Sequence, residues 1–344
     1  MSNDDTLVVR NLQVAFDAGG RRLPAVRDVS FDLAPGQSMA VVGESGSGKS
    51  AMARAVLGLT GLEGGEASGE IHYRGQDLLS LSASQLRAVR GAELSMVFQD
   101  SSDSLDPVFT VGSQLVELLR TRGGLDRRSA WAKAAELLGQ VGIASPAERV
   151  RQYPHQFSGG MRQRVNIAMA IALDPRVLIA DEPTTALDVT IQAEILRVIR
   201  RLVRELDMSL IFITHDLVVA QQIADHVAVM YAGQIVESGR IAEIFDNPSH
   251  PYTVGLLKSH PASRRKGQRL EPIPGRPASA SQAGTGCAFA PRCAWAQPQC
   301  REDEPALRPA LSGRMSRCHF AEAVVDRIQA DGKAVVGGDG AHDG

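Results

Sequence analysis

The chain has 344 residues, enough for one large domain or two modest ones with a buried core. Its 37 basic and 39 acidic residues nearly balance, so no general positive field would draw nucleic acid to it. Residues 1–6 are polar and acidic, unlike a secretory signal, and the longest apolar run, residues 167–173, is far shorter than the roughly 20 residues that span a bilayer. We therefore expect a cytosolic protein that meets a membrane only through other chains.

Strands are expected at the start of the chain. Residues 7–33 alternate apolar and polar side chains in short pieces, which predicts antiparallel strands. An apolar stretch, residues 39–42, follows and leads into a glycine-rich run, residues 43–50, and then into a helix over residues 51–57.

The glycine-rich run reads G-E-S-G-S-G-K-S, which is the full spelling of a phosphate-binding loop between strand and helix. Gly43, Gly46 and Gly48 would allow positive φ and a close approach to phosphates, which inward-facing amides at a helix N-terminus can cradle. Lys49 would supply charge to the β and γ groups, and the Ser50 hydroxyl would ligate magnesium. A glycine-rich turn that binds nothing is the alternative, and the strand–loop–helix context argues against it.

Helices and strands alternate further along. Residues 128–141 have helical spacing, with Trp131 expected as a core anchor, and a second apolar stripe runs from Ile191 to Leu202. That second helix lies between strand-like runs at residues 177–180 and 210–213. Strands that alternate with helices predict an α/β fold whose parallel sheet is covered on both faces.

Two carboxylates end the strand at residues 177–180. Asp181 and Glu182 would project at the carboxyl end of the sheet, where ligands gather in open α/β folds. We expect Asp181 to hold magnesium, directly or through water, and Glu182 to polarise an attacking water. Two capping carboxylates before Pro183 would be the structural alternative.

The order of these motifs, together with the run Y-P-H-Q-F-S-G-G-M-R-Q-R at residues 153–164, resembles the ATP-binding cassette (ABC) family over about residues 7–258. The resemblance implies a P-loop fold with a parallel-sheet core, an antiparallel β subdomain and an α-helical signature subdomain at about residues 100–172. It implies two such subunits head to tail, with each ATP between the loop of one and the signature of the other.

The resemblance assigns roles to particular residues. Gln99 would touch magnesium and report to membrane subunits, His215 would contact the γ-phosphate and hold water with Glu182, and Phe16 would stack on adenine unless it is an ordinary core aromatic. The implied ATP-binding residues of the loop are Gly43, Ser45, Gly46, Ser47, Gly48, Lys49, Ser50 and Ala51. The implied signature residues, which serve the partner's ATP, are Phe157, Ser158, Gly159, Gly160 and Met161, with Asp188 in the segment after Glu182. Many members have Leu and Gln where Phe157 and Met161 stand.

All four cysteines lie near the C-terminus, at Cys287, Cys293, Cys300 and Cys318, separated by five, six and seventeen residues. In a cytosolic chain this clustering favours metal over disulfides, yet the spacing matches neither the usual structural zinc pairing nor the common ferredoxin patterns. Spacing alone leaves the metal open.

The segments around these cysteines, with H-P-Y-T at residues 250–253, resemble the C-terminal extension of the oligopeptide and dipeptide importer ATPases. That resemblance implies that the four thiolates hold a four-iron, four-sulfur cluster, with zinc and free thiols as the alternatives. We therefore expect a cassette over residues 1–258, a cysteine-rich extension over 259–325 and a disordered tail over 326–344.

The implied function is ATP hydrolysis that powers peptide import. The chain would lie at the cytoplasmic face of the membrane with a second, different ATPase subunit, two permease subunits and an extracytoplasmic peptide-binding protein, and without nucleic acid. An importer ATPase for another solute, such as nickel, and a soluble ABC ATPase that remodels DNA or ribosomes stay open as alternatives.

Overall fold

The computed structural model describes residues 6–99, 104–185, 187–260, 272–310 and 313–330. The chain divides into two units, which we describe separately. Unit 1 contains Leu33–Ser38 and Ser80–Ile213, and unit 2 contains Leu7–Asp32, Met39–Leu79 and the chain from Thr214 onward.

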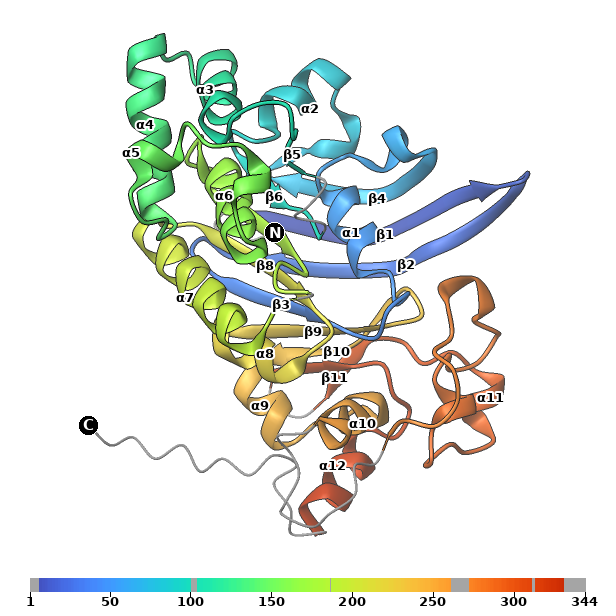
Figure 1. The fold of residues 1–344 in the computed structure, drawn as a ribbon. Helices are drawn as coiled ribbons and strands as arrows, with labels where there is room; N and C mark the ends of the chain where they lie inside the picture. Colours follow the sequence, from blue (N-terminus) through green and yellow to red (C-terminus); the bar gives the residue numbers. More distant parts are fainter. Residues whose placement is uncertain (1–5, 100–103, 186, 261–271, 311–312, 331–344) are drawn as a thin grey trace. The chain divides into compact units, whose positions relative to one another are not determined.

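Unit 1 is built on three parallel strands with helices around them (Figure 1). Strand β7 lies between β6 and β8, pairing Leu94 with Val177 and Val177 with Ser209. Every residue of the three strands is buried, as expected for parallel strands covered on both faces. Their bounds are β6 (Leu94–Val97), β7 (Val177–Asp181) and β8 (Ser209–Thr214).

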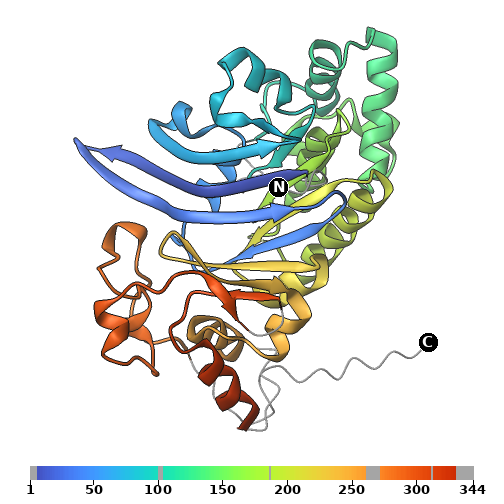
Figure 2. The same cartoon turned by 180° about the vertical axis from the view of Figure 1, so that it is seen from behind.

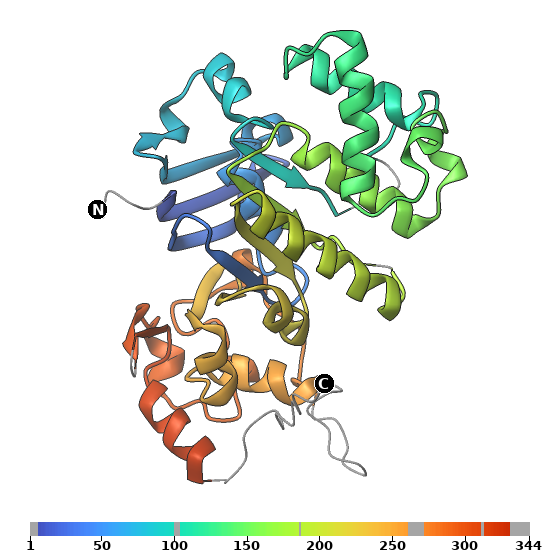
Figure 3. The same ribbon diagram turned by 90° about the vertical axis from the view of Figure 1, so that its left-hand side faces the viewer.

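The helices of unit 1 begin at polar caps. The carboxylate of Asp126 accepts hydrogen bonds from the amides of Arg128 and Ser129 at the start of α4, and α3 packs along α4 in the green bundle of Figure 3. Trp131, expected in the core, is only half-buried, because its helix lies at the surface of the bundle. The helices are α2 (Ala83–Val89), α3 (Val111–Thr121), α4 (Arg127–Gln140), α5 (Pro146–Arg149), α6 (Gly159–Ile171) and α7 (Val189–Glu205).

Unit 2 contains an antiparallel sheet of order β2-β1-β4-β5, whose long outer hairpin is prominent in Figure 2. The strands are β1 (Leu7–Ala18), β2 (Arg21–Leu33), β4 (Gly65–Tyr73) and β5 (Gln76–Asp77). The expected strands within residues 7–33 are therefore present. A turn at Gly19 and Gly20 joins them, and the Asp17 carboxylate accepts a hydrogen bond of 2.8 Å from the Gly20 amide.

A second group of strands in unit 2 has the order β11-β12-β10-β9-β3. Strands β3 (Ser38–Val42) and β9 (His226–Tyr231) are parallel, and β10 (Gln234–Arg240), β12 (Arg314–Ser316) and β11 (Arg308–Ala310) continue antiparallel from β9. The cysteine-rich extension thus adds two strands to a sheet begun by the cassette. The expected boundary at residue 258 falls inside α10.

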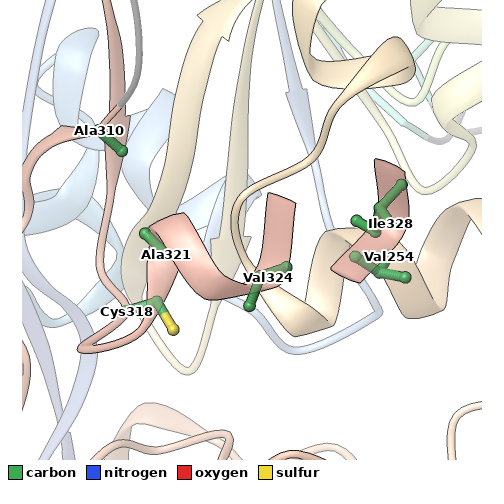
Figure 4. Packing of buried hydrophobic residues seen from close by; sticks show 6 residues of the cluster. All are labelled: Val254, Ala310, Cys318, Ala321, Val324 and Ile328. Atoms are coloured by element: carbon green, nitrogen blue, oxygen red, sulfur yellow. The ribbon is translucent and has the colours of Figure 1, made fainter. Parts of the chain in front are cut away.

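The remaining helices of unit 2 are α1 (Lys49–Val56), α8 (Leu217–Ile223), α9 (Ile241–Asp246), α10 (Pro251–Ser259), α11 (Gln299–Glu302) and α12 (Ala321–Ala330). Helix α12 includes residues 326–330, which were expected in the tail, because Val324, Val325 and Ile328 are buried on one of its faces. Figure 4 shows Val324 and Ile328 together with Val254 of α10 and Cys318. Residues 331–344 lie outside the described part of the chain. Within the described residues, no helix is both long and apolar enough to cross a bilayer.

Candidate nucleotide and cysteine sites

The glycine-rich loop joins β3 to α1 in unit 2, as its sequence predicts. Gly48 has φ 101°, and a Cβ there would approach the Ala25 carbonyl oxygen to 2.4 Å, so no other residue fits without a shift. Gly43 does not have positive φ. It is required for a different reason, since a Cβ would lie 2.2 Å from the Met230 carbonyl oxygen in β9.

Polar groups converge at this loop. The Lys49 ammonium donates to the carbonyl oxygens of Gly43 and Glu44, at 2.8 and 3.1 Å, and the lysine is 4% exposed. The Ser47 side chain is buried, and its hydroxyl has no hydrogen-bond partner among the described residues. Ser50 lies in the first turn of α1, and the N-terminus of a helix is where backbone amides bind anions.

Two residues that the sequence reasoning did not place at the loop also contact it. The Tyr252 hydroxyl accepts a hydrogen bond from the Glu44 amide, and the Arg292 guanidinium pairs with the Glu44 carboxylate. Both come from the region that was recognised only by its resemblance to the importer extension. No local sequence signal indicates these contacts, because Tyr252 and Arg292 lie more than 200 positions from Glu44.

At the end of β7, in unit 1, Asp181 is buried and Glu182 is half-buried. Glu182 has φ 45°, a left-handed conformation that is uncommon for a residue with a side chain and concentrates at functional sites. Its amide donates to the Ile213 carbonyl oxygen at 3.0 Å, and its carboxylate accepts a bond of 2.9 Å from the Thr185 hydroxyl. This turn holds the carboxylate in a defined direction.

The other expected catalytic residues follow the ends of strands. Gln99 is exposed two residues after β6 in unit 1, and His215 is exposed just after β8 in unit 2. Asp188 is exposed at the N-cap of α7. Phe16, near the end of β1, is half-buried and lies against Gly65 of β4.

The signature segment opens α6, as expected. The Ser158 hydroxyl caps the helix by accepting a hydrogen bond of 3.3 Å from the Met161 amide. Ser158 and Gly159 are exposed, whereas Phe157 is 3% exposed and anchors the segment in the helical bundle. Phe157 stands where many members have leucine, and its burial shows that the fold accommodates the larger apolar side chain.

The four cysteines line one cavity in unit 2, together with Phe289, Trp295 and Phe320. Burial, followed by the proximity of the other thiols, raises the pKa of Cys293 to about 11 and that of Cys318 to about 12. The Cys287 amide donates to the Cys300 carbonyl oxygen at 2.8 Å and ties the first cysteine to the third. Within the described residues, no three His, Cys, Asp or Glu side chains form a group that could hold a metal ion.

The fold and the loop define an α/β protein of the P-loop class. Two family models match the chain, that of the ABC transporter over residues 26–185 and that of the oligopeptide/dipeptide transporter C-terminal region over residues 236–300. Among solved structures, the dimeric structure of a post-hydrolysis state of the ATP-binding cassette MJ0796, bound to ADP and Pi, matches with a TM-score of 0.61 at 25% identity, covering 68% of this chain and 98% of that one.

Curated relatives are closer in sequence. The oligopeptide transport ATP-binding protein OppD of Bacillus subtilis is 49% identical over 303 residues, covering 88% of this chain and 85% of the relative. The dipeptide transport ATP-binding protein DppD of the same organism is 48% identical over 291 residues, covering 84% and 87%. A peptide import ATP-binding protein of Brucella abortus is 50% identical over 312 residues, covering 91% and 94%. The chain therefore belongs to the ABC transporter ATPases, in the oligopeptide and dipeptide transporter branch.

Proposed function

We propose that the loop at residues 43–50 binds the triphosphate of ATP and that its hydrolysis drives peptide import. The observation that carries this proposal is the loop geometry, in which Gly48 turns the chain into α1 and Lys49 is held at the loop by two carbonyl oxygens. A phosphate that binds at the loop can replace the two carbonyl oxygens as the partner of the Lys49 ammonium. The helix N-terminus supplies amides to the same anion.

The residues expected at magnesium each carry an oxygen of the kind that this ion prefers. Ser50 would supply a hydroxyl, Asp181 a carboxylate and Gln99 an amide oxygen. The bound ion would neutralise charge on the phosphate oxygens. Glu182 would orient the attacking water and accept its proton, with His215 contacting the γ-phosphate, and Phe16 would stack on adenine.

A second subunit completes this scheme. Ser158 and Gly159 are exposed at the start of α6, so their amides are accessible to the ATP of a partner. Asp188 is exposed as well and suits contact across such an interface. The MJ0796 cassette, which this chain resembles, is dimeric. We assign the same head-to-tail role to the signature here, with a different ATPase subunit as the partner.

The relatives are named for peptide import, oligopeptide transport and dipeptide transport. By analogy, the chain works at the cytoplasmic face of the membrane with two permease subunits and an extracytoplasmic peptide-binding protein. Closure around ATP and reopening after hydrolysis would shift the permeases between their two access states.

The cysteine cavity supports a structural four-iron, four-sulfur cluster. Such a cluster takes one thiolate at each iron, and all four cysteines line one cavity. Zinc, which four thiolates can also hold, is the alternative. The cluster would link segments that have little regular structure of their own.

Reconstitution of the complete complex tests the function. Binding protein loaded with peptides should stimulate the ATPase, and labelled peptide should enter vesicles only when ATP is present on the side that carries this chain. The matched control is the complex with Lys49→Ala in this chain, which should lose the stimulation. Stimulation by a metal ion or sugar in place of peptides would contradict peptide import while retaining the ATPase.

A further inference from the structure

The extension reaches the nucleotide loop through one buried arginine. Arg292 donates to both carboxylate oxygens of Glu44, at 2.6 and 3.0 Å, and its side chain is 5% exposed. A two-pronged arginine–carboxylate pair fixes direction as well as distance, so it restrains the loop residue it holds.

Arg292 is itself held from several sides. Its Nε donates to the Pro274 carbonyl oxygen at 2.8 Å, and its guanidinium carbon lies 5.8 and 5.9 Å from the ring centres of Tyr231 and Phe289. The guanidinium therefore has little freedom to follow Glu44 if the loop moves.

A second contact holds the backbone of the same loop residue. The Glu44 amide donates to the Tyr252 hydroxyl at 2.8 Å, and the Tyr252 ring packs against Tyr231 and Phe289. Lys49 donates to the Glu44 carbonyl oxygen from the other side of the peptide. Glu44 is thus fixed at its side chain, its amide and its carbonyl.

The anchor is part of the cysteine-lined segment. Arg292 ends a short 3-10 turn, Ala290–Arg292, that directly precedes Cys293, and the Ala290 amide donates to the Cys287 carbonyl oxygen at 2.9 Å. Cys287 and Cys293 both line the cavity. A displacement of these two cysteines would therefore move the arginine.

We propose that Arg292 and Tyr252 are positioning residues, through which the segment between Cys287 and Cys293 holds the phosphate loop in its nucleotide-binding shape. This inference rests on the proposed nucleotide binding at residues 43–50. It adds a role in ATP affinity to an extension that would otherwise serve only stability.

The test measures the affinity of the full-length chain for Mg·ATP and the hydrogen exchange of the loop amides. Arg292→Lys keeps the positive charge but cannot donate to both carboxylate oxygens, and Glu44→Gln keeps the side-chain shape but removes the negative charge. Each variant should raise the Kd for Mg·ATP about tenfold, as expected for loss of a charged hydrogen-bonded pair. Amides in the loop should exchange faster, while those of α12 stay unchanged. Because the two residues act as one unit, the double variant should bind no more weakly than either single variant.

Two further variants complete the test. Tyr252→Phe removes only the oxygen that the Glu44 amide contacts, so it should speed exchange at that amide with the aromatic packing intact. Glu322→Gln is the matched control, because Arg308 pairs with both oxygens of Glu322, at 2.8 and 3.0 Å, within the extension. Arg308 also donates to the Cys318 carbonyl oxygen at 3.4 Å, but no described hydrogen bond joins this pair to the loop. Its Kd should equal that of the unaltered chain.

The outcomes separate the two proposals. If the unaltered chain fails to bind Mg·ATP, or Lys49→Ala binds it equally well, the nucleotide site itself is wrong. If binding is normal and both Arg292→Lys and Glu44→Gln stay within twofold of it, the positioning role is overturned. A double variant that binds clearly more weakly than either single variant would also overturn it, because the two residues would then act separately. Should Arg292→Lys fail to fold, Glu44→Gln and Tyr252→Phe decide the matter.

Discussion

At the end of β7, the direction of the Glu182 carboxylate is restrained by its backbone conformation and by one hydrogen bond. Its left-handed backbone and its bond to the Thr185 hydroxyl leave few orientations for the side chain. A residue with φ above zero carries a conformational cost that an ordinary cap would not require. This restraint suits the proposed catalytic role, which the following variant tests.

Glu182→Gln is expected to lower ATP turnover by about 10²-fold or more, since the amide cannot accept the proton of the attacking water. ATP should remain bound and the closed dimer should accumulate. Phosphate release and retention of labelled ATP by the assembled complex measure the two effects. Glu205→Gln, at the exposed end of α7, is the control and should turn over normally. Unchanged turnover in Glu182→Gln would remove this residue from water activation.

The loop residues were predictable because a phosphate-binding loop is formed by neighbouring residues, so its pattern is visible in the sequence. Gly48 must turn left-handed and Lys49 must follow it, whatever the rest of the fold does. Arg292 was not predictable, because its partner Glu44 is 248 positions away and only the tertiary fold brings them together. The glycine at position 43 was predicted to allow positive φ. The structure instead requires glycine there because the backbone of β9 lies too close for a Cβ, and no local sequence pattern reveals that contact.

Among the elements, long and strongly patterned segments matched their sequence. The continuous apolar run of β7 and the stripe of α7 predicted their burial, and Ser158 predicted the start of α6. The short strands β11 and β12 were missed, because three residues are too few to display a period of two. Their pairing depends on β10, which precedes β12 by more than seventy residues.

The segment that contains the four cysteines is expected to bind metal. Full-length chain purified without oxygen should contain about four irons and four sulfides and should be brown, because each thiol would bind one iron. Cys300→Ser should lose most of this iron, measured by metal and sulfide assays. His319→Ala is the control, since its ring contacts the Asp303 carbonyl oxygen at 2.9 Å instead of completing the set of thiols. Colourless protein with one zinc per chain would end the cluster proposal.

For the molecule as a whole, the two nucleotide motifs of this chain serve different sites in the proposed dimer. In that proposal the loop would bind this chain's own ATP, and the signature would contact the ATP of the partner. A change in the signature should therefore leave ATP binding by the isolated chain unaltered and should slow ATP hydrolysis by the complex.

Ser158→Asp provides that separation, because aspartate also caps a helix but brings negative charge to the partner's phosphate. The isolated chain should bind ATP with unchanged affinity, whereas the complex should hydrolyse it at least about tenfold more slowly. Binding titrations and phosphate release measure the two quantities. Ser82→Asp, at the capped start of α2, is the matched control. Equal loss of binding in the isolated chain would contradict the division of roles.

The pairing of β12 with β10 also has a consequence for biosynthesis. Glu237 and Ser238 of β10 acquire their neighbours in β12 only when residues 314–316 have emerged from the ribosome. Until then a strand edge with unmet amides stays open to pairing with other nascent chains. A stop codon placed after α10 should therefore yield insoluble material even though every nucleotide motif has already been translated.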